Sequence, residues 1–199
     1  AETLVAQSAD FIVVSTEQEK RDLGRLYDVA AERVDVVPAG VDLDLFQPMD
    51  QSKARQELGL TESKIILSVG RVEPIKGVDI LISAVSKLND ISDTRLLVVG
   101  GEPGSDPELQ KLVELAATLG VADSVTFTGA VEQTELPKYY SAADVFVMPS
   151  YYESFGLAAL EAMACGTPIV ASSAAGGPKS FVDEGETGYL IPWPSPESY

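Results

Sequence analysis

The stretch KIILSVGRVEPIKGVD (64–79) carries the features that predict the fold. Its first six residues are a short apolar run, typical of a strand buried on both faces. A glycine-containing loop follows, and a helix is expected to begin near Val78. Similar strand candidates lie at 11–14, 34–37, 95–99, 124–128, 145–148, 169–172 and 189–191, with helix candidates at 17–27, 52–58, 78–88, 106–119, 134–142, 157–165 and 178–184. This alternation predicts an α/β protein with a Rossmann-like, doubly wound parallel sheet.

One irregular segment interrupts the alternation. VPAGVDLDLFQPMDQ (37–51) contains two prolines, a glycine and three aspartates, as is typical of a linker. We therefore interpret residues 1–45 as the tail of one domain with its linker, and 46–199 as a second domain. Ser195 and Pro196 open a helix that has no further residues, so the second domain is expected to be truncated and the chain to be a piece of a longer one.

Composition excludes several classes of function. The net charge of −17 disfavours binding to nucleic acid. No apolar run approaches the roughly 18 residues that a membrane-spanning helix needs. Histidine is absent, and the single cysteine, Cys165, is expected to be a buried thiol in a reducing compartment, the cytoplasm.

The loop after the first strand of the second domain holds two cations, Arg71 and Lys76, between Gly70 and Gly77. Ligands of parallel sheets collect at the carboxyl ends of strands, where a diphosphate would need cations on so acidic a protein. Two solvated surface charges explain the loop equally well. Neither a Walker A pattern nor G-x-G-x-x-G occurs in the sequence.

Two glutamates, Glu153 and Glu161, interrupt the apolar stretch YYESFGLAALEAMACG (151–166). Residues 157–165 are expected to form a helix that is apolar all round and therefore buried. Glu161 on such a helix needs a partner: an arginine, a backbone amide, or the hydroxyls of a ligand. Glu153 either favours the helix N-terminus or binds a ligand that approaches Gly156.

Two further loops follow strands at the same predicted edge of the sheet. Gly129 ends the candidate strand at 124–128, and residues 171–180 include Lys179, which is more simply explained as a solvated loop lysine. A ligand that spans several of these loops would lie along the carboxyl edge of the sheet.

Four ordered motifs, GRVEPIKG, FTGAVEQTELPKYYSAADVFVMPS, ESFGLAALEAMACGTPIVAS and GETGYLIP, closely resemble retaining glycosyltransferases of family 4, which have the GT-B architecture. The resemblance implies that Arg71 and Lys76 hold the donor diphosphate, Glu153 the sugar hydroxyls and Glu161 the ribose hydroxyls. The implied catalytic residues are Glu153, Arg71 and Lys76, and the implied donor-binding residues are Gly70, Arg71, Lys76, Gly129, Glu153, Ser154, Phe155, Gly156, Leu157 and Glu161. No metal and no cofactor is expected.

The expected function is transfer of a hexosyl group, with retention, from a nucleotide sugar to an unidentified acceptor, and the donor is expected to be UDP-linked. The fragment alone is expected to be inactive, and the rest of the N-terminal domain could contact a membrane surface. Ser180 stands where the family commonly has a glutamate, and GGP (176–178) is reminiscent of sucrose synthases and sucrose-phosphate synthases. Such a transferase, a non-catalytic sugar-nucleotide-binding domain and a GT-B epimerase are the alternatives.

Overall fold

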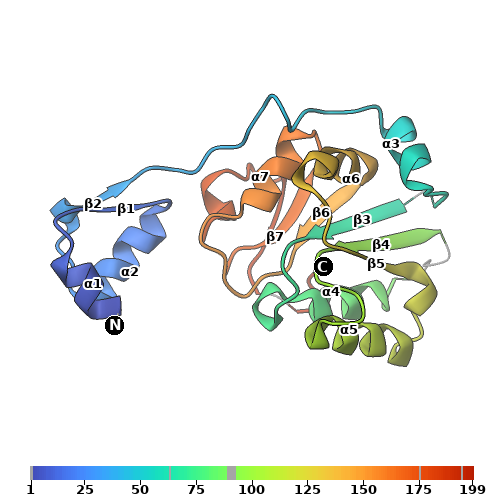
Figure 1. Ribbon diagram of the computed structural model, residues 1–199, viewed down its shortest axis with the longest axis horizontal. Helices are drawn as coiled ribbons and strands as arrows, with labels where there is room; N and C mark the ends of the chain where they lie inside the picture. Colours follow the sequence, from blue (N-terminus) through green and yellow to red (C-terminus); the bar gives the residue numbers. More distant parts are fainter. Residues whose placement is uncertain (1, 63, 89–92, 175, 194) are drawn as a thin grey trace.

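The computed structural model describes residues 2–62, 64–88, 93–174, 176–193 and 195–199. A small N-terminal unit and a larger α/β unit are joined by an extended segment (Figure 1). The small unit consists of helices α1 (Glu2–Ser8) and α2 (Glu17–Tyr27) and the parallel strands β1 (Ile12–Val14) and β2 (Val34–Val36). Its fully buried apolar residues are Ala6, Val29 and Val34, a core too small to be stable alone. Helix α1 was not expected from the sequence pattern.

The larger unit is built on a parallel sheet of six strands in the order β5-β4-β3-β6-β7-β8. Every neighbouring pair in this sheet is parallel. The strands are β3 (Lys64–Val69), β4 (Thr94–Val99), β5 (Val125–Gly129), β6 (Val145–Met148), β7 (Ile169–Ser172) and β8 (Gly188–Ile191). The predicted α/β class and parallel sheet are confirmed, and each predicted strand lies within one residue of an observed one.

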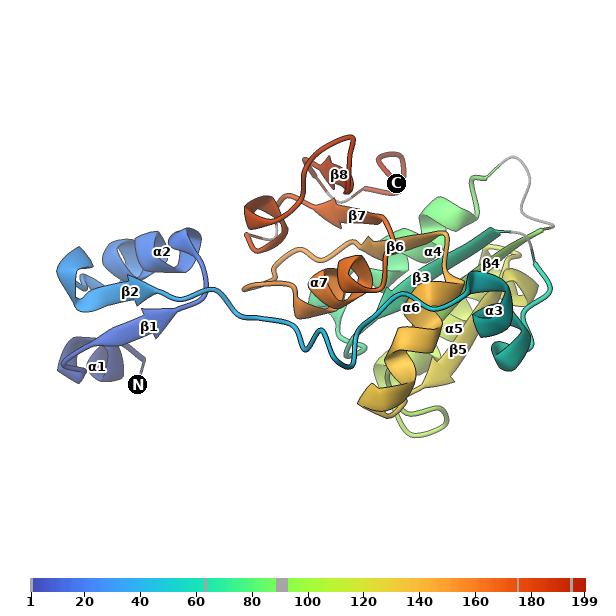
Figure 2. The ribbon, with the colours of Figure 1, turned by 90° about the horizontal axis from the view of Figure 1, so that it is seen from above.

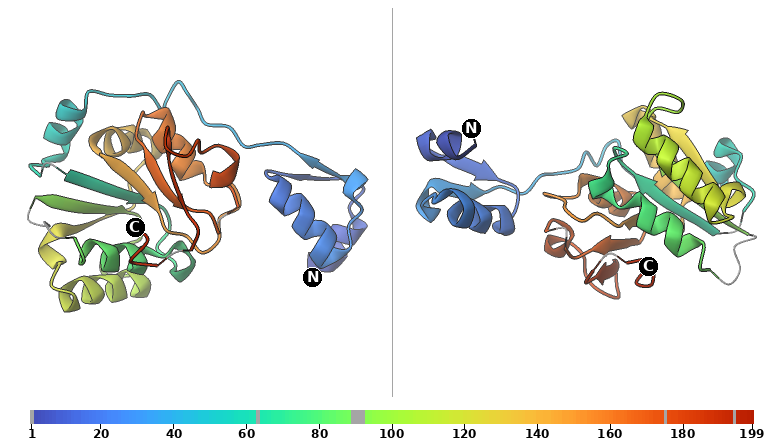
Figure 3. Two further views of the ribbon diagram at one scale, coloured as in Figure 1. Left: turned by 180° about the vertical axis from the view of Figure 1, so that it is seen from behind. Right: turned by 90° about the horizontal axis from the view of Figure 1, so that it is seen from below.

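Helices cover both faces of the sheet, as the doubly wound prediction requires. The helices α3 (Gln51–Leu58), α6 (Leu136–Ala142) and α7 (Leu157–Ala164) lie on one face, and α4 (Val78–Val85) and α5 (Pro107–Thr118) lie on the other (Figures 1 and 3). Each layer has its own apolar cluster. Tyr140 and Phe146 lie at the centre of the first, and Leu81 and Ile82 are part of the second.

The predicted helix at 178–184 is wrong. Only a single 3₁₀ turn, Pro178–Ser180, forms there. The backbone amide of Thr187 donates to the carbonyl of Asp183, and this turn leads the chain into β8. Residues 183–187 belong to this hydrogen-bonded turn, so a helix does not extend to residue 184.

Between residues 37 and 50 the chain forms neither helix nor strand, which agrees with its irregular composition. Figure 2 shows this segment leaving β2 and running past α7 and α6 to α3. Phe46, 1% exposed, packs edge-on against Tyr140 with ring centroids 6.1 Å apart. The segment is therefore attached to the larger unit through an aromatic side chain as well as through the chain itself.

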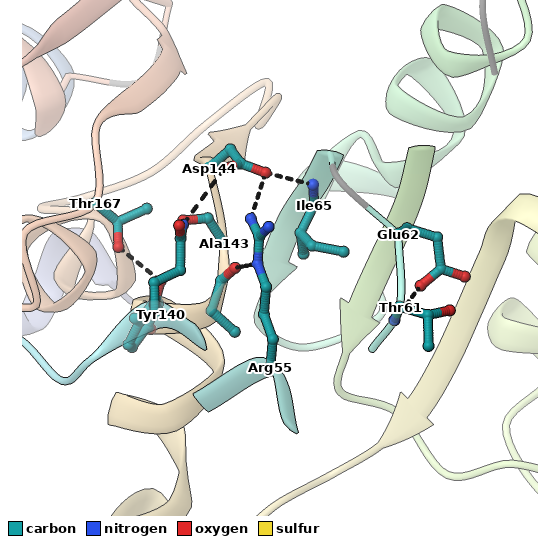
Figure 4. Close-up of polar contacts among 10 residues, drawn as sticks. Arg55, Thr61, Glu62, Ile65, Tyr140, Ala143, Asp144 and Thr167 are labelled. Atoms are coloured by element: carbon teal, nitrogen blue, oxygen red, sulfur yellow. Dashed lines mark hydrogen bonds and ion pairs between the residues drawn. The ribbon is translucent and has the colours of Figure 1, made fainter. Parts of the chain in front are cut away.

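Asp144 ties together three elements of the larger unit (Figure 4). Its Oδ2 accepts a hydrogen bond from the amide of Ile65 at 2.6 Å and pairs with Arg55 Nη2 at 2.7 Å. Arg55 Nε also donates to the carbonyl of Ala142 at 2.9 Å. The start of β3, the end of α6 and the helix α3 are thus fixed to one another by charge-assisted bonds.

Candidate functional site

The main candidate site lies at the carboxyl ends of β3 and β6, the two central strands of the sheet. The chain leaves β3 toward β4 and β5 and then returns to place β6 on the other side of β3. Such a reversal of strand order separates the loops of the two strands and leaves a crevice where ligands bind. A cavity of about 310 Å³ occupies this position. Its lining residues are Ser68, Val69, Gly70, Arg71, Lys76, Val78, Val98, Val99, Met148, Pro149, Ser150, Glu153, Leu157 and Ala158.

The rim of this cavity is made by backbone packed on backbone. Gly100 has φ 138°, and a Cβ there would lie 1.9 Å from the carbonyl oxygen of Gly70. Gly77 has φ 66°, and its Cβ would lie 2.3 Å from the carbonyl oxygen of Pro149. Only glycine allows both the conformation and the contact at these two positions. The loops after β3, β4 and β6 are therefore held together at the mouth of the cavity.

Lys76 and Glu153 form an ion pair inside the cavity. Nζ of Lys76 lies 2.5 Å from Oε2 of Glu153, and the side chains are 21% and 20% exposed. Lys76 ends the 3₁₀ turn Pro74–Lys76, and the amide of Tyr151 donates to the carbonyl of Ile75 at 2.9 Å. This bond between the two loops fixes the backbone next to both charged residues.

Arg71 lies at the outer edge of the same cavity. Its side chain is 77% exposed and pairs with Glu73 at 2.5 Å. An exposed pair of this kind contributes little to stability, so the guanidinium can turn toward a ligand at small cost. The structure thus places Gly70, Arg71, Lys76, Glu153 and Leu157, five of the residues named from the sequence, around one cavity.

The stretch that precedes α7 contributes fewer cavity-lining residues than predicted. Gly156 is the N-cap, with φ 90° and no side chain to bond the first amides of the helix, and Leu157 and Ala158 line the cavity. Phe155 is buried and packs against Phe181, with ring centroids 5.7 Å apart. Ser154 is exposed, and neither Ser154, Phe155 nor Gly156 is among the lining residues.

Glu161 lies one helical turn further along α7, outside the lining of the cavity. Its Oε2 accepts a hydrogen bond of 2.8 Å from the hydroxyl of Tyr140, which is 0% exposed. Burial raises the pKa of Glu161, and the bond from Tyr140 partly opposes this shift. The partner in the structure is a tyrosine rather than the expected arginine or backbone amide. No sequence signal pointed to it, because a tyrosine in a helix is typical of a core residue.

The helix α7 is not buried all round, which corrects the prediction for 157–165. Its buried side chains are Ala159 and Ala162, with Cys165 following at 4% exposed. Leu157 on the opposite face is 45% exposed, and Glu161 is partly exposed. Apolar composition alone cannot tell a helix with one open apolar face from one with none.

Cys165 is buried as expected, and burial raises the pKa of its thiol to about 11.

Gly129 supports the rim and does not line the cavity. Its carbonyl accepts a hydrogen bond of 2.9 Å from the amide of Gly100.

A separate polar hollow of about 330 Å³ lies between α2 and the loop after β7, lined by Arg21 and Lys179 among others. Lys179 is therefore exposed and away from Lys76, and Ser180 donates to the carbonyl of Gly177 at 2.6 Å. Ala175, within the loop predicted at 171–180, lies outside the described residues.

The described residues offer neither a metal-binding group nor a membrane-spanning helix. They contain no group of three or more acidic, cysteine or histidine side chains placed to hold a metal ion. Within the same residues, no helix is long and apolar enough to cross a membrane.

Comparison with known proteins places the chain in a family. The family described as glycosyl transferases group 1 matches residues 50–199, which include the whole six-stranded sheet and its cavity. The chain belongs to this family. The predicted resemblance and the GT-B type of fold are thereby confirmed.

Two curated group 1 relatives illustrate the similarity. The D-inositol 3-phosphate glycosyltransferase of Mycobacteroides abscessus is 42% identical over 193 residues, which are 96% of this chain and 43% of that protein. The D-inositol 3-phosphate glycosyltransferase 2 of Catenulispora acidiphila is 43% identical over 205 residues, 100% of this chain and 48% of that protein. The chain spans about half the length of the curated relatives it matches.

Solved structures give the same result. Sucrose-phosphate synthase from Thermosynechococcus elongatus matches with a TM-score of 0.89 and 38% identity, covering 99% of this chain and 49% of that one. HepE of Anabaena, solved with UDP and glucose, matches with a TM-score of 0.86 and 27% identity, covering 98% of this chain and 52% of that one.

Proposed function

We propose that this chain is the donor-binding half of a retaining hexosyltransferase whose donor is a UDP-sugar. The observation that carries the proposal is the Lys76–Glu153 pair in the cavity at the ends of β3 and β6. It places a cation suited to a diphosphate beside a carboxylate suited to sugar hydroxyls, in one space of about 310 Å³. The solved complex of HepE with UDP and glucose, a similar protein, supports this choice of donor.

Each charged residue has a distinct proposed role. When the bond between the sugar and the diphosphate breaks, negative charge grows on the departing oxygen, and Lys76 and Arg71 neutralise it. Lys76 is the stronger contributor because its ammonium is mostly shielded from water, whereas Arg71 is 77% exposed. Glu153 accepts hydrogen bonds from the sugar, and Glu161, held by Tyr140, accepts them from the ribose.

The proposed reaction takes place in the cytoplasm and needs no cofactor. No cofactor is assigned, and the two cations carry the charge that the leaving group requires. The buried single thiol and the acidic composition suit the reducing cytoplasm. Contact with a membrane surface is proposed only for the rest of the N-terminal domain. Turnover requires that domain, since the cavity of this chain alone leaves the reacting sugar open to water.

A calorimetric titration with UDP tests the donor site. Lys76→Ala should lower the affinity about tenfold or more, since a hydrogen bond to a charged group contributes roughly 1.5–3 kcal/mol. The affinity of the wild-type chain should also fall as salt rises. Lys111→Ala is a matched control, because Lys111 is an exposed cation on α5 whose one ion-pair partner among the described residues is the nearby Glu108. Equal affinities of wild type and Lys76→Ala would contradict the proposal.

A further inference from the structure

Ser150 follows β6, ends one of the sequence motifs and lines the same cavity, but none of the proposed roles uses it. The residue is 1% exposed. Its Oγ is buried and has no hydrogen-bond partner among the described residues. A buried hydroxyl without a partner costs folding free energy, because it has lost its hydrogen bonds to water and gained none. The protein therefore keeps an unfavourable group at the wall of its main cavity.

The backbone around Ser150 is fixed on both sides. The carbonyl of Pro149 packs against Gly77, and the amide of Tyr151 donates to the carbonyl of Ile75. Ser150 itself retains one freedom, rotation about χ1, which moves the hydroxyl among three staggered positions. A change of χ1 is therefore the movement that would bring the hydroxyl to a bound molecule.

The neighbours of Ser150 indicate what it would meet. The cavity also holds Lys76 and Glu153, the proposed partners of the diphosphate and of the sugar. Both parts of such a donor present oxygen atoms that can accept a hydrogen bond from a serine hydroxyl. The Ser150 hydroxyl is already removed from water in the free protein. A ligand that bonds it therefore gains a hydrogen bond without paying again for the loss of water from this group.

We propose that Ser150 is a further donor-binding residue, whose hydroxyl hydrogen-bonds an oxygen of the sugar diphosphate. The proposal rests on the proposed function, since it names a contact within the same donor site. The proposed contact predicts opposite effects of Ser150→Ala on the stability of the free protein and on ligand binding. The change should leave the free protein as stable or more stable, because it removes a buried unpaired hydroxyl. It should weaken binding about fivefold if the acceptor is a sugar hydroxyl, and about tenfold or more if it is a charged diphosphate oxygen.

The experiment pairs thermal unfolding of the free chain with calorimetric titration of UDP and UDP-glucose. Losses of equal size for the two ligands place the contact on the diphosphate, and a loss for UDP-glucose alone places it on the sugar. Ser141→Ala is the matched control. Ser141 is also buried, but its Oγ accepts a hydrogen bond from the amide of Met49 at 3.1 Å, away from the cavity. This variant should lose stability and bind both ligands normally.

A lower unfolding temperature for Ser150→Ala, or unchanged affinity for both ligands, overturns the inference. Lys76→Ala in the same series separates this failure from failure of the proposed function. If Lys76→Ala weakens UDP binding and Ser150→Ala does not, only the role of Ser150 is wrong. If neither does, the donor site itself is wrong.

Discussion

Nζ of Lys76 lies 2.5 Å from Oε2 of Glu153, although 77 positions separate the two residues in the chain. Each is therefore the other's partner in the free protein. A donor that binds here must replace this pair with two contacts of its own, the diphosphate for Lys76 and the sugar for Glu153. UDP, which lacks the sugar, can satisfy only the lysine.

Glu153→Gln should tighten the binding of UDP. The change frees Lys76 from its carboxylate and removes a negative charge from the neighbourhood of the diphosphate. A partly buried pair of this kind is worth about 1 kcal/mol, so a gain of roughly fivefold is expected. The extra affinity that UDP-glucose shows over UDP should fall at the same time. Titration of both ligands checks this, and weaker UDP binding by the variant would contradict it.

Tyr140→Phe should weaken UDP binding, and more so in mild acid. The hydrogen bond from Tyr140 opposes the rise in the pKa of Glu161 that burial causes, so without it this pKa rises further. The carboxylate then protonates at a higher pH and loses capacity to accept from the ribose. The ratio of variant to wild-type dissociation constants should therefore grow as pH falls from 8 toward 5.5. Tyr139→Phe, on the same helix, is the control and should give a constant ratio.

Glu161→Gln should stabilise the free chain at neutral pH. Burial raises the pKa of Glu161 above the usual 4.5, so the folded state binds its proton more tightly than the unfolded state does. The stability associated with this proton is present below the unfolded pKa and is lost as pH rises through the folded pKa. Glutamine keeps the acceptor for Tyr140 without the charge, so its advantage at pH 7.5 should shrink toward pH 4.

Urea unfolding at the two pH values measures this difference. Glu186→Gln, in an exposed turn, is the control and should change stability little at either pH. An advantage of Glu161→Gln that is independent of pH would mean that charge is not its cause.

Asp144→Ala should destabilise the fold by about 2–3 kcal/mol, because it leaves the amide of Ile65 and the guanidinium of Arg55 without this acceptor. UDP binding by the folded fraction should not change, since Asp144 lies at the opposite ends of β3 and β6 from the cavity. Urea unfolding and titration measure the two effects. Asp35→Ala, an exposed residue of β2, serves as the control.

The parts of the fold that could be predicted are those where burial acts on a regular pattern. The strands β3, β6 and β7 begin and end at the predicted residues because both faces of the sheet are covered. Lys76 and Glu153 were named as candidates because they are charges in loops at strand ends and belong to the motifs that carry the family resemblance. Tyr140 and Ser150 were not named as candidates, because the features that distinguish them leave no mark on local sequence. Tyr140 bonds Glu161, which is distant in the sequence, and the hydroxyl of Ser150 has no partner among the described residues. The helix predicted at 178–184 failed because the return into β8 needs a turn.

The glycine contacts at the rim have a consequence for engineering. A library that randomises Gly77 or Gly100 should return almost no folded clones other than the parent, since any side chain at either position collides with a carbonyl of the adjoining loop. Changes in the accepted sugar would then have to be sought in side chains that reach the cavity over a fixed backbone, such as Arg71 and Leu157. Loops exchanged with a relative would have to be transplanted as a matched set.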